Sequence, residues 1–105
     1  MKLYSYFRSS SAFRVRIALN LKGIDYQPIA IDLSASEQLS ASYLAQNPQG
    51  RVPALVLHDG TVIAQSIAIL EWLEETVPET ALLPQDAAQR AYVRGLCQHI
   101  ACDMQ

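Results

Sequence analysis

The sequence predicts an α/β fold with the element order β-α-β-α-β-β-α, and three observations support this prediction. First, short β-prone segments at Lys2–Tyr6 and Tyr26–Ile31 flank a helical pattern at Ala12–Lys22. Second, a His-Asp-Gly-Thr turn at residues 58–61 joins two apolar segments, as in a β-hairpin. Third, 50% of the residues are hydrophobic and 17% are charged, which is ordinary for a globular domain.

The first three elements form a βαβ unit, whose crossover is expected to be right-handed. Pro28 in the second strand indicates an edge position, because proline cannot donate a hydrogen bond to a neighbouring strand. Gly23 is typical of a residue that ends a helix. The apolar positions of the helix recur mostly at three- and four-residue spacing: Val15, Ile17, Ala18, Leu19 and Leu21.

The second half supplies the remaining elements. A polar stretch from Ser34 to Ser40 opens a less regular helix, which the breaker Asn47-Pro48-Gln49-Gly50 ends. Strands are expected at residues 54–57 and 62–64, and Ser66 is expected to cap a helix at Ile67–Thr76. The apolar side of that helix carries Ile69, Leu70, Leu73 and Val77, and its solvated side carries Glu71, Glu74 and Glu75. This order of elements is that of the thioredoxin fold.

The segment Val77–Pro84 contains a proline near each end, which is typical of a linker between domains. We therefore expect a thioredoxin-like domain over residues 1–80, and a linker with the first helix of an all-α domain over residues 81–105. The helical pattern from Gln85 reaches Gln105 without a cap or stop signal. The sequence thus predicts a chain that ends before its helical domain is complete.

Composition and charge exclude several classes of function. The net charge of -2 gives no basic surface, so no nucleic-acid partner is expected. No apolar run approaches the roughly 20 residues that span a bilayer, so no membrane association is expected. Cys97 and Cys102 lie five apart without a cluster of histidines, which indicates neither a metal site nor a disulfide. We expect a cytoplasmic protein without a signal peptide.

A serine block, Ser9-Ser10-Ser11, lies where the first strand ends and the first helix begins. Unpaired N–H groups and the positive end of the helix dipole favour an anion at such a point. A hydroxyl there can donate to a thiolate and hold it deprotonated near neutral pH. The alternative interpretation is that these serines only cap the helix.

Further positions suit a bound ligand with carboxylates. The proline of Val52-Pro53 precedes a strand, where it is often cis and turns backbone groups outward. At Gln65-Ser66, a hydroxyl and backbone N–H groups at a helix start could bind a carboxylate, unless Ser66 is a simple cap. One of three arginines could clamp a substrate carboxylate, the alternative being solvated charges: Arg8, Arg14 and Arg16.

Together these segments resemble the zeta-class glutathione transferases. Residues 4–19, YSYFRSSSAFRVRIAL, resemble the class signature S-S-C-x-x-R-V-R-I-A-L. Further matching segments are Asn47-Pro48, Val52-Pro53-Ala54-Leu55, QSIAILEWLEE at residues 65–75, and Leu82-Leu83-Pro84. The resemblance implies a glutathione-binding domain and a homodimer. In bacteria it implies a maleylacetoacetate or maleylpyruvate isomerase, and with it a place in aromatic amino acid catabolism.

The resemblance also implies a role for each matching position. Ser9 would stabilise the glutathione thiolate with Ser10 beside it, both as catalytic residues, and Ser11 stands where the family often has cysteine. The backbone of Val52 would pair with the cysteinyl part of glutathione, with Pro53 holding the bend. The other glutathione contacts would come from Ser11, Gln38, Gln65, Ser66 and Gln105. A small dicarboxylic substrate would be bound by Arg8 and Arg14.

Three alternatives to an isomerase can be weighed from the sequence. A thioredoxin- or glutaredoxin-like oxidoreductase requires a cysteine at the start of the first helix, where this chain has Ser9-Ser10-Ser11-Ala12. A transferase of the same class that conjugates or dehalogenates small α-halo acids would share the thiolate site. A non-catalytic, transferase-like binding module would not bind glutathione. The last two stay open at this point.

Overall fold

The computed structural model describes residues 1–103 and confirms the predicted order of elements. Four strands form one sheet in the order β2-β1-β3-β4: β1 is Lys2–Ser5, β2 is Gln27–Ala30, β3 is Ala54–Val56 and β4 is Val62–Ala64. Strand β1 pairs in parallel with β2 and antiparallel with β3, which pairs antiparallel with β4. Pro28 lies on the edge strand, as predicted. This is a thioredoxin-like arrangement.

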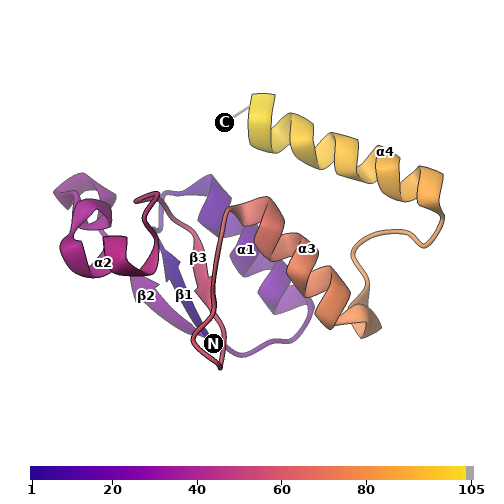
Figure 1. Ribbon diagram of the computed structural model, residues 1–105. Coiled ribbons are helices and arrows are strands. Elements are labelled where there is room, and N and C mark those ends of the chain that lie inside the picture. The colour runs from indigo at the N-terminus through magenta and orange to yellow at the C-terminus, as the bar shows by residue number, and fades with distance from the viewer. Residues whose placement is uncertain (104–105) are drawn as a thin grey trace.

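Helices cover both faces of the sheet (Figure 1). Helices α1 (Ser10–Leu21) and α3 (Ser66–Thr76) lie side by side on one face, and α2 (Ala41–Gln46) lies on the other. The less regular helix before the breaker consists of α2 and the 3-10 turns Leu33–Ala35 and Glu37–Leu39. Side chains alternate between the faces of a strand, so each face has its own core.

The main core lies between the sheet and the pair α1 and α3. Leu3 and Leu55 face each other across β1 and β3, and both are fully buried. The helices contribute Val15, Ala18, Leu19, Ile69 and Leu73 to this core. On the other face, Tyr4 meets Tyr43 edge-on with ring centroids 5.2 Å apart.

Two helix starts differ from the prediction. Helix α1 begins at Ser10 because the Ser9 hydroxyl accepts a hydrogen bond from the Ala12 N–H at 3.1 Å, which makes Ser9 the cap. The prediction that Ser66 caps α3 is wrong: Ser66 is the first helical residue, and Gln65 stands at the cap position without a side-chain capping bond. Ser66 is buried, and its hydroxyl accepts a hydrogen bond from Arg14 Nη1 at 3.1 Å.

The prediction that Glu74 lies on the solvated side of α3 is also wrong. Glu74 is buried and forms an ion pair with the fully buried Lys22 side chain at 3.0 Å. The physical reason is the path of the linker, which folds back over the ends of α1 and α3. Its backbone donates to the Glu74 carboxylate from Leu82 and Leu83.

The linker contains a 3-10 turn at Pro78–Thr80 and leads to α4, Ala87–Gln98, which continues as a π-helical turn at His99–Asp103. The Asp86 carboxylate caps α4 by accepting from the Gln89 N–H at 3.0 Å, a signal that the sequence analysis missed. Helix α4 lies across α1 and α3 (Figure 1). Both cysteines are free thiols. In the described part of the chain, no helix is long and apolar enough to cross a membrane.

Candidate functional site

A cleft of about 460 Å³ lies between the starts of α1 and α3, the loop before β3 and the end of α4. It brings together six of the residues predicted from the sequence: Ser11, Arg14, Val52, Pro53, Gln65 and Ser66. These residues come from three segments that are far apart along the chain. Only folding makes them one site.

The loop that carries Val52 and Pro53 is organised by the buried Asn47. Asn47 Nδ2 donates to the Arg51 carbonyl at 2.8 Å, and Asn47 Oδ1 accepts from the Gln49 N–H at 3.2 Å. The hydroxyl of Tyr43 donates to the same Arg51 carbonyl, and burial raises the pKa of Tyr43. The Asn47 side chain therefore supplies hydrogen bonds to loop backbone groups of Gln49 and Arg51, and so it shapes the turn.

Gly50 in this loop has a φ of +64°, a conformation that favours glycine. A Cβ at this position would stand 3.2 Å from the backbone carbonyl oxygen of Gln38, so the space is also restricted. After the turn, the Val52–Pro53 peptide bond is cis. The loop thereby delivers Val52 and Pro53 to the cleft directly before β3.

The start of α3 forms the opposite wall. Gln65 has a φ of +76°, which is rare for a residue with a side chain, and its Nε2 donates to Gln49 Oε1 at 2.7 Å. Sparsely populated backbone conformations cluster at ligand-binding sites, where the surrounding structure holds them. The first N–H groups of a helix have no partner within the helix, so they can bind a ligand.

The electrostatics of the cleft favour an anion. Among the described residues that line it, Arg14 and Arg51 are cationic and none is acidic. The N-terminus of α3 adds the positive end of its dipole, and the N-terminus of α1 lies beside it. Such a site suits a polar ligand that carries carboxylates.

The structure divides the serine block between two hollows. Ser11 lines the cleft, whereas Ser9 and Ser10 line an adjacent hollow of about 280 Å³ with Arg8 and two exposed phenylalanines. The capping bond of Ser9 uses an oxygen lone pair, which leaves its O–H able to donate. Capping and thiolate stabilisation by Ser9 are therefore compatible.

Two further predicted residues lie elsewhere. The guanidinium of Arg8 stacks on the Phe7 ring at 5.4 Å, outside the cleft. Gln38 is in the 3-10 turn Glu37–Leu39 and does not line the cleft. Its Oε1 is buried without a hydrogen-bond partner in the described part of the chain. Gln105 lies outside the described residues.

The cleft also contains residues that the sequence analysis did not assign to it: Asn47, Gln49, Arg51, Ile67, Gln98, Ala101 and Cys102. Gln49 belongs to the breaker Asn47-Pro48-Gln49-Gly50, and its position beside Val52-Pro53 was a usable signal. The residues of α4 and its π-helical turn carried no such signal, because their contribution depends on how the linker folds back.

Residues 8–76 match the family model of the glutathione S-transferase N-terminal domain. The chain belongs to the glutathione S-transferase family. The matched range includes the serine block, the cis-proline loop and α3, which together form most of the cleft.

The relatives of the chain confirm its resemblance to the zeta class of this family. It is 51% identical to maleylacetoacetate isomerase of Pseudomonas aeruginosa, covering 99% of this chain and 50% of the relative. The holo structure of a zeta-class bacterial maleylpyruvate isomerase superposes with a TM-score of 0.95 at 48% identity, covering 100% of this chain and 49% of that one.

A second solved structure is that of maleylacetoacetate isomerase from Methylobacterium extorquens AM1 with bound malonate and glutathione. It superposes with a TM-score of 0.93 at 52% identity, covering 98% of this chain and 48% of that chain. The chain thus spans about half the length of the proteins that it matches.

Proposed function

We propose that the protein binds glutathione in the cleft and uses its thiolate to isomerise a maleyl compound, maleylacetoacetate or maleylpyruvate. The thiolate adds to one carbon of the cis double bond, and the resulting single bond rotates. The thiolate then leaves as the double bond re-forms in the trans, fumaryl geometry. Glutathione is regenerated and acts as a cofactor. The observation that carries the proposal is an anion-binding cleft between the serine block and α3 in a chain of this family.

Glutathione has two carboxylates and an extended backbone, and the cleft offers partners for the γ-glutamyl carboxylate and for the backbone. Gln65, Ser66 and the N-terminus of α3 suit the γ-glutamyl carboxylate, with Arg14 held beside them by its bond to Ser66. The backbone of Val52 suits the cysteinyl part, with Pro53 at the bend. The sulfur then points to the start of α1. Gln38 and Gln105 stay predictions for the remaining contacts.

The substrate is a small dicarboxylate in this proposal, and the relative with bound malonate supports it. Arg8 is one candidate, because it lines the same hollow as Ser9 and Ser10. Arg14 is the second candidate, at the cleft itself. Homodimeric assembly, a cytoplasmic location, a role in aromatic amino acid catabolism and the domain division at residue 80 belong to the same proposal.

The test is turnover of maleylacetoacetate and maleylpyruvate by the full-length protein, with and without glutathione. We expect turnover to require glutathione, and an equal rate without it contradicts the mechanism. The same assay with α-halo acids distinguishes the conjugating or dehalogenating transferase. Calorimetry with glutathione distinguishes the non-catalytic module, for which no binding heat is expected.

The serine roles are tested by single substitutions. Removing the hydroxyl that donates to the thiolate lowers kcat about 100-fold and raises the pKa of the bound thiol toward about 8.5. Ser9→Ala removes both the cap and the donor, whereas Ser9→Gly removes the donor but destabilises the helix start much less, because glycine is tolerated at the cap position. Loss of activity in both variants assigns the thiolate to Ser9. Activity lost only in Ser11→Ala assigns it to Ser11, the serine that lines the cleft.

A further inference from the structure

The outer wall of the cleft is supplied by α4 and the turn that follows it. Gln98, Ala101 and Cys102 line the cleft, and Cys102 Sγ donates to Gln98 Oε1 at 3.1 Å. In the described part of the chain, however, α4 has no buried residue. Hydrophobic burial therefore does not hold this wall in the way that it holds α1 and α3.

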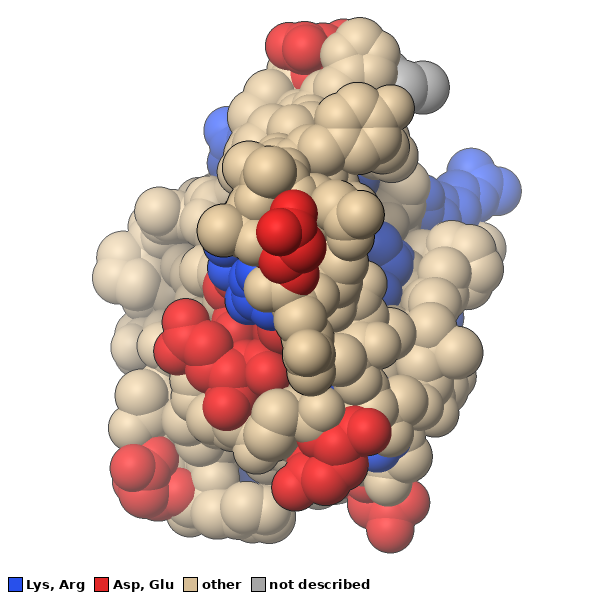
Figure 2. Space-filling model, turned by 90° about the vertical axis from the view of Figure 1, so that its right-hand side faces the viewer, with Lys and Arg blue, Asp and Glu red and all other residues tan. Residues whose placement is uncertain are grey.

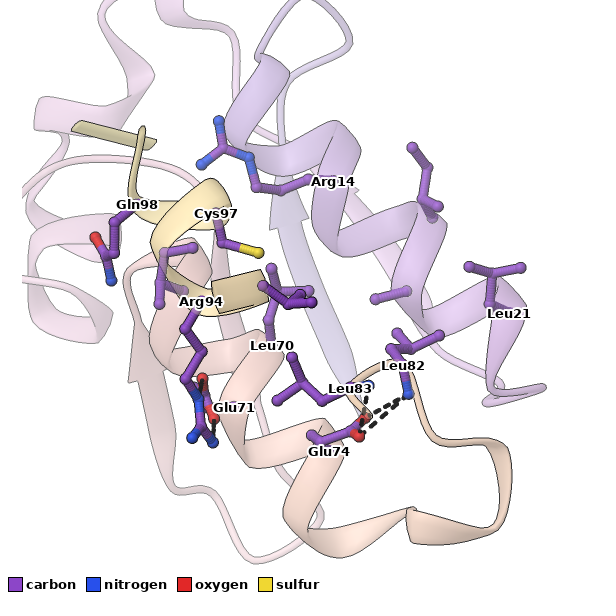
Figure 3. Close-up of a pocket in the computed structure, with 14 residues that line it drawn as sticks. Arg14, Leu21, Leu70, Glu71, Glu74, Leu82, Leu83, Arg94, Cys97 and Gln98 are labelled. Atoms are coloured by element: carbon purple, nitrogen blue, oxygen red, sulfur yellow. Dashed lines mark hydrogen bonds and ion pairs between the residues drawn. The ribbon is translucent and has the colours of Figure 1, made fainter. Parts of the chain in front are cut away.

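A bidentate ion pair attaches α4 to α3 instead (Figure 3). Arg94 Nε donates to Glu71 Oε1 at 2.9 Å, and Arg94 Nη2 donates to Glu71 Oε2 at 3.0 Å. Glu71 raises the pKa of Arg94, with smaller contributions from Glu75 and Glu74. Acidic side chains also gather below α4 on the face shown in Figure 2. A two-bond fork fixes direction as well as distance, which a single charge contact does not.

A second set of bonds fixes the linker that leads to α4. Lys22 Nζ donates to Glu74 at 3.0 Å and to the carbonyls of Val77 and Thr80 at 2.8 Å each. Glu74 in turn accepts hydrogen bonds from the N–H groups of Leu82 and Leu83, which Figure 3 shows as dashed lines. Farther along, Arg90 Nη1 donates to the Pro84 carbonyl at 3.0 Å. These hydrogen bonds therefore fix the position of the N-terminal end of α4.

Two attachment points set the direction of a rigid helix. The linker holds the beginning of α4, and Arg94 holds it one turn before Gln98. Glu71 and Arg94 do not line the cleft; they line a neighbouring, mostly apolar cavity of about 260 Å³ between α1, α3 and α4, which shares Arg14, Ile67 and Gln98 with the cleft. Their influence on a ligand in the cleft is therefore indirect, through the position of the α4 wall.

We propose that Glu71 and Arg94 are positioning residues for glutathione binding. Their fork holds α4 where Gln98 and Cys102 close the cleft over the ligand. This inference rests on the proposed function. Breaking the fork lets α4 move away and weakens glutathione binding, while the start of α1, which holds the thiolate, and the start of α3, which holds the γ-glutamyl carboxylate, are unchanged.

The experiment is calorimetric titration of glutathione into the full-length protein, with kcat at saturating glutathione measured alongside. Arg94→Gln and Glu71→Gln are expected to raise the glutathione Kd about two- to fivefold, the range for a partly exposed pair. The pKa of the bound thiol and kcat stay at the wild-type values. The matched control is Glu79→Gln, which removes an exposed carboxylate of the linker and leaves the Kd unchanged.

Pair exchange tests the fork itself. Arg94→Glu weakens binding, and adding Glu71→Arg brings the Kd back toward the wild-type value, because the swapped pair restores the contact. Arg94→Lys keeps the charge but cannot form the fork, so it weakens binding as well. It also serves as the second measurement where another variant fails to fold.

The outcomes separate the two proposals. Absence of glutathione binding by the wild-type protein overturns the proposed function and this inference with it. Normal wild-type binding with an unchanged Kd in Arg94→Gln and Arg94→Lys overturns this inference alone. A fall in kcat or a shift in thiol pKa as large as that of the serine variants also overturns it, because a positioning role affects affinity only.

Discussion

The thioredoxin-like body and helix α4 are held together by different forces. The body buries complete side chains between the sheet and the pair α1 and α3, including Leu3, Leu55 and Leu73. Helix α4 leaves Tyr92 71% exposed and Leu96 50% exposed, and the ion pair between Arg94 and Glu71 attaches it to the body. Hydrophobic burial is strong and non-directional, whereas an ion pair is weaker in water and directional.

This difference matters because the candidate site is built from both regions. The body supplies the serine block, the cis-proline loop and the start of α3, and α4 supplies the outer wall. The surface proposed to bind glutathione thus faces a wall that the Glu71–Arg94 ion pair attaches to the body. Lys22 and Glu74 lie at the boundary, where a charged pair is buried within the body.

The largest expected effect is in the core of the body. Leu73→Ala removes a fully buried side chain and lowers the free energy of unfolding by about 3 kcal/mol. Leu96→Ala is the matched change on α4, and it alters the free energy of unfolding by less than about 0.5 kcal/mol. Urea denaturation measures both. Equal effects would show that α4 is held by burial after all.

The next effect is at the boundary. Glu74→Gln leaves the buried Lys22 ammonium without its counter-charge and lowers the free energy of unfolding by about 2–3 kcal/mol. Glu75→Gln, an exposed position on the same helix, changes it little. Replacing both partners, by Lys22→Met with Glu74→Gln, recovers part of the loss. The buried pair is unimportant if Glu74→Gln denatures at the same urea concentration as the wild type.

Acid should weaken the buried Lys22–Glu74 pair and so lower the free energy of unfolding. Burial alone would raise the pKa of Glu74, but donors from Leu82, Leu83 and Lys22 lower it below the ordinary value of 4.5. A folded pKa below the unfolded one means that this stabilisation is complete above about pH 4.5 and is lost as the pH falls through the folded pKa. Denaturation series at decreasing pH check this. Glu74→Gln should show a shallower decline than the wild type.

The smallest expected effect is the response of α4 to salt. The Glu71–Arg94 pair is partly exposed, so raising the salt concentration from about 0.05 to about 0.5 M screens it. We expect faster amide hydrogen exchange in α4 and unchanged exchange in α3. Exchange in α4 that does not respond to salt would mean that the fork does not hold this helix.

Most of the body could be predicted from the sequence, because its elements depend on local periodicity. Val15, Ala18 and Leu19 were expected in the core and are buried there. Ile17 and Leu21 are exposed instead and face the cavity under α4. The predictions for Ser66 and Glu74 were wrong because their partners, Arg14 and Lys22, each lie 52 residues away.

The amino-acid sequence alone predicts the order of strands and helices along the chain and the segments that mark a family. Local propensity and side-chain spacing decide these features over a few residues at a time. Folding brings Ser11, rather than Ser9, to the cleft and places α4 as its outer wall, and neither could be predicted from local sequence. Both depend on contacts between distant segments. Ser11 meets the loop before β3 and the start of α3, and α4 is placed by the linker that Lys22 and Glu74 hold.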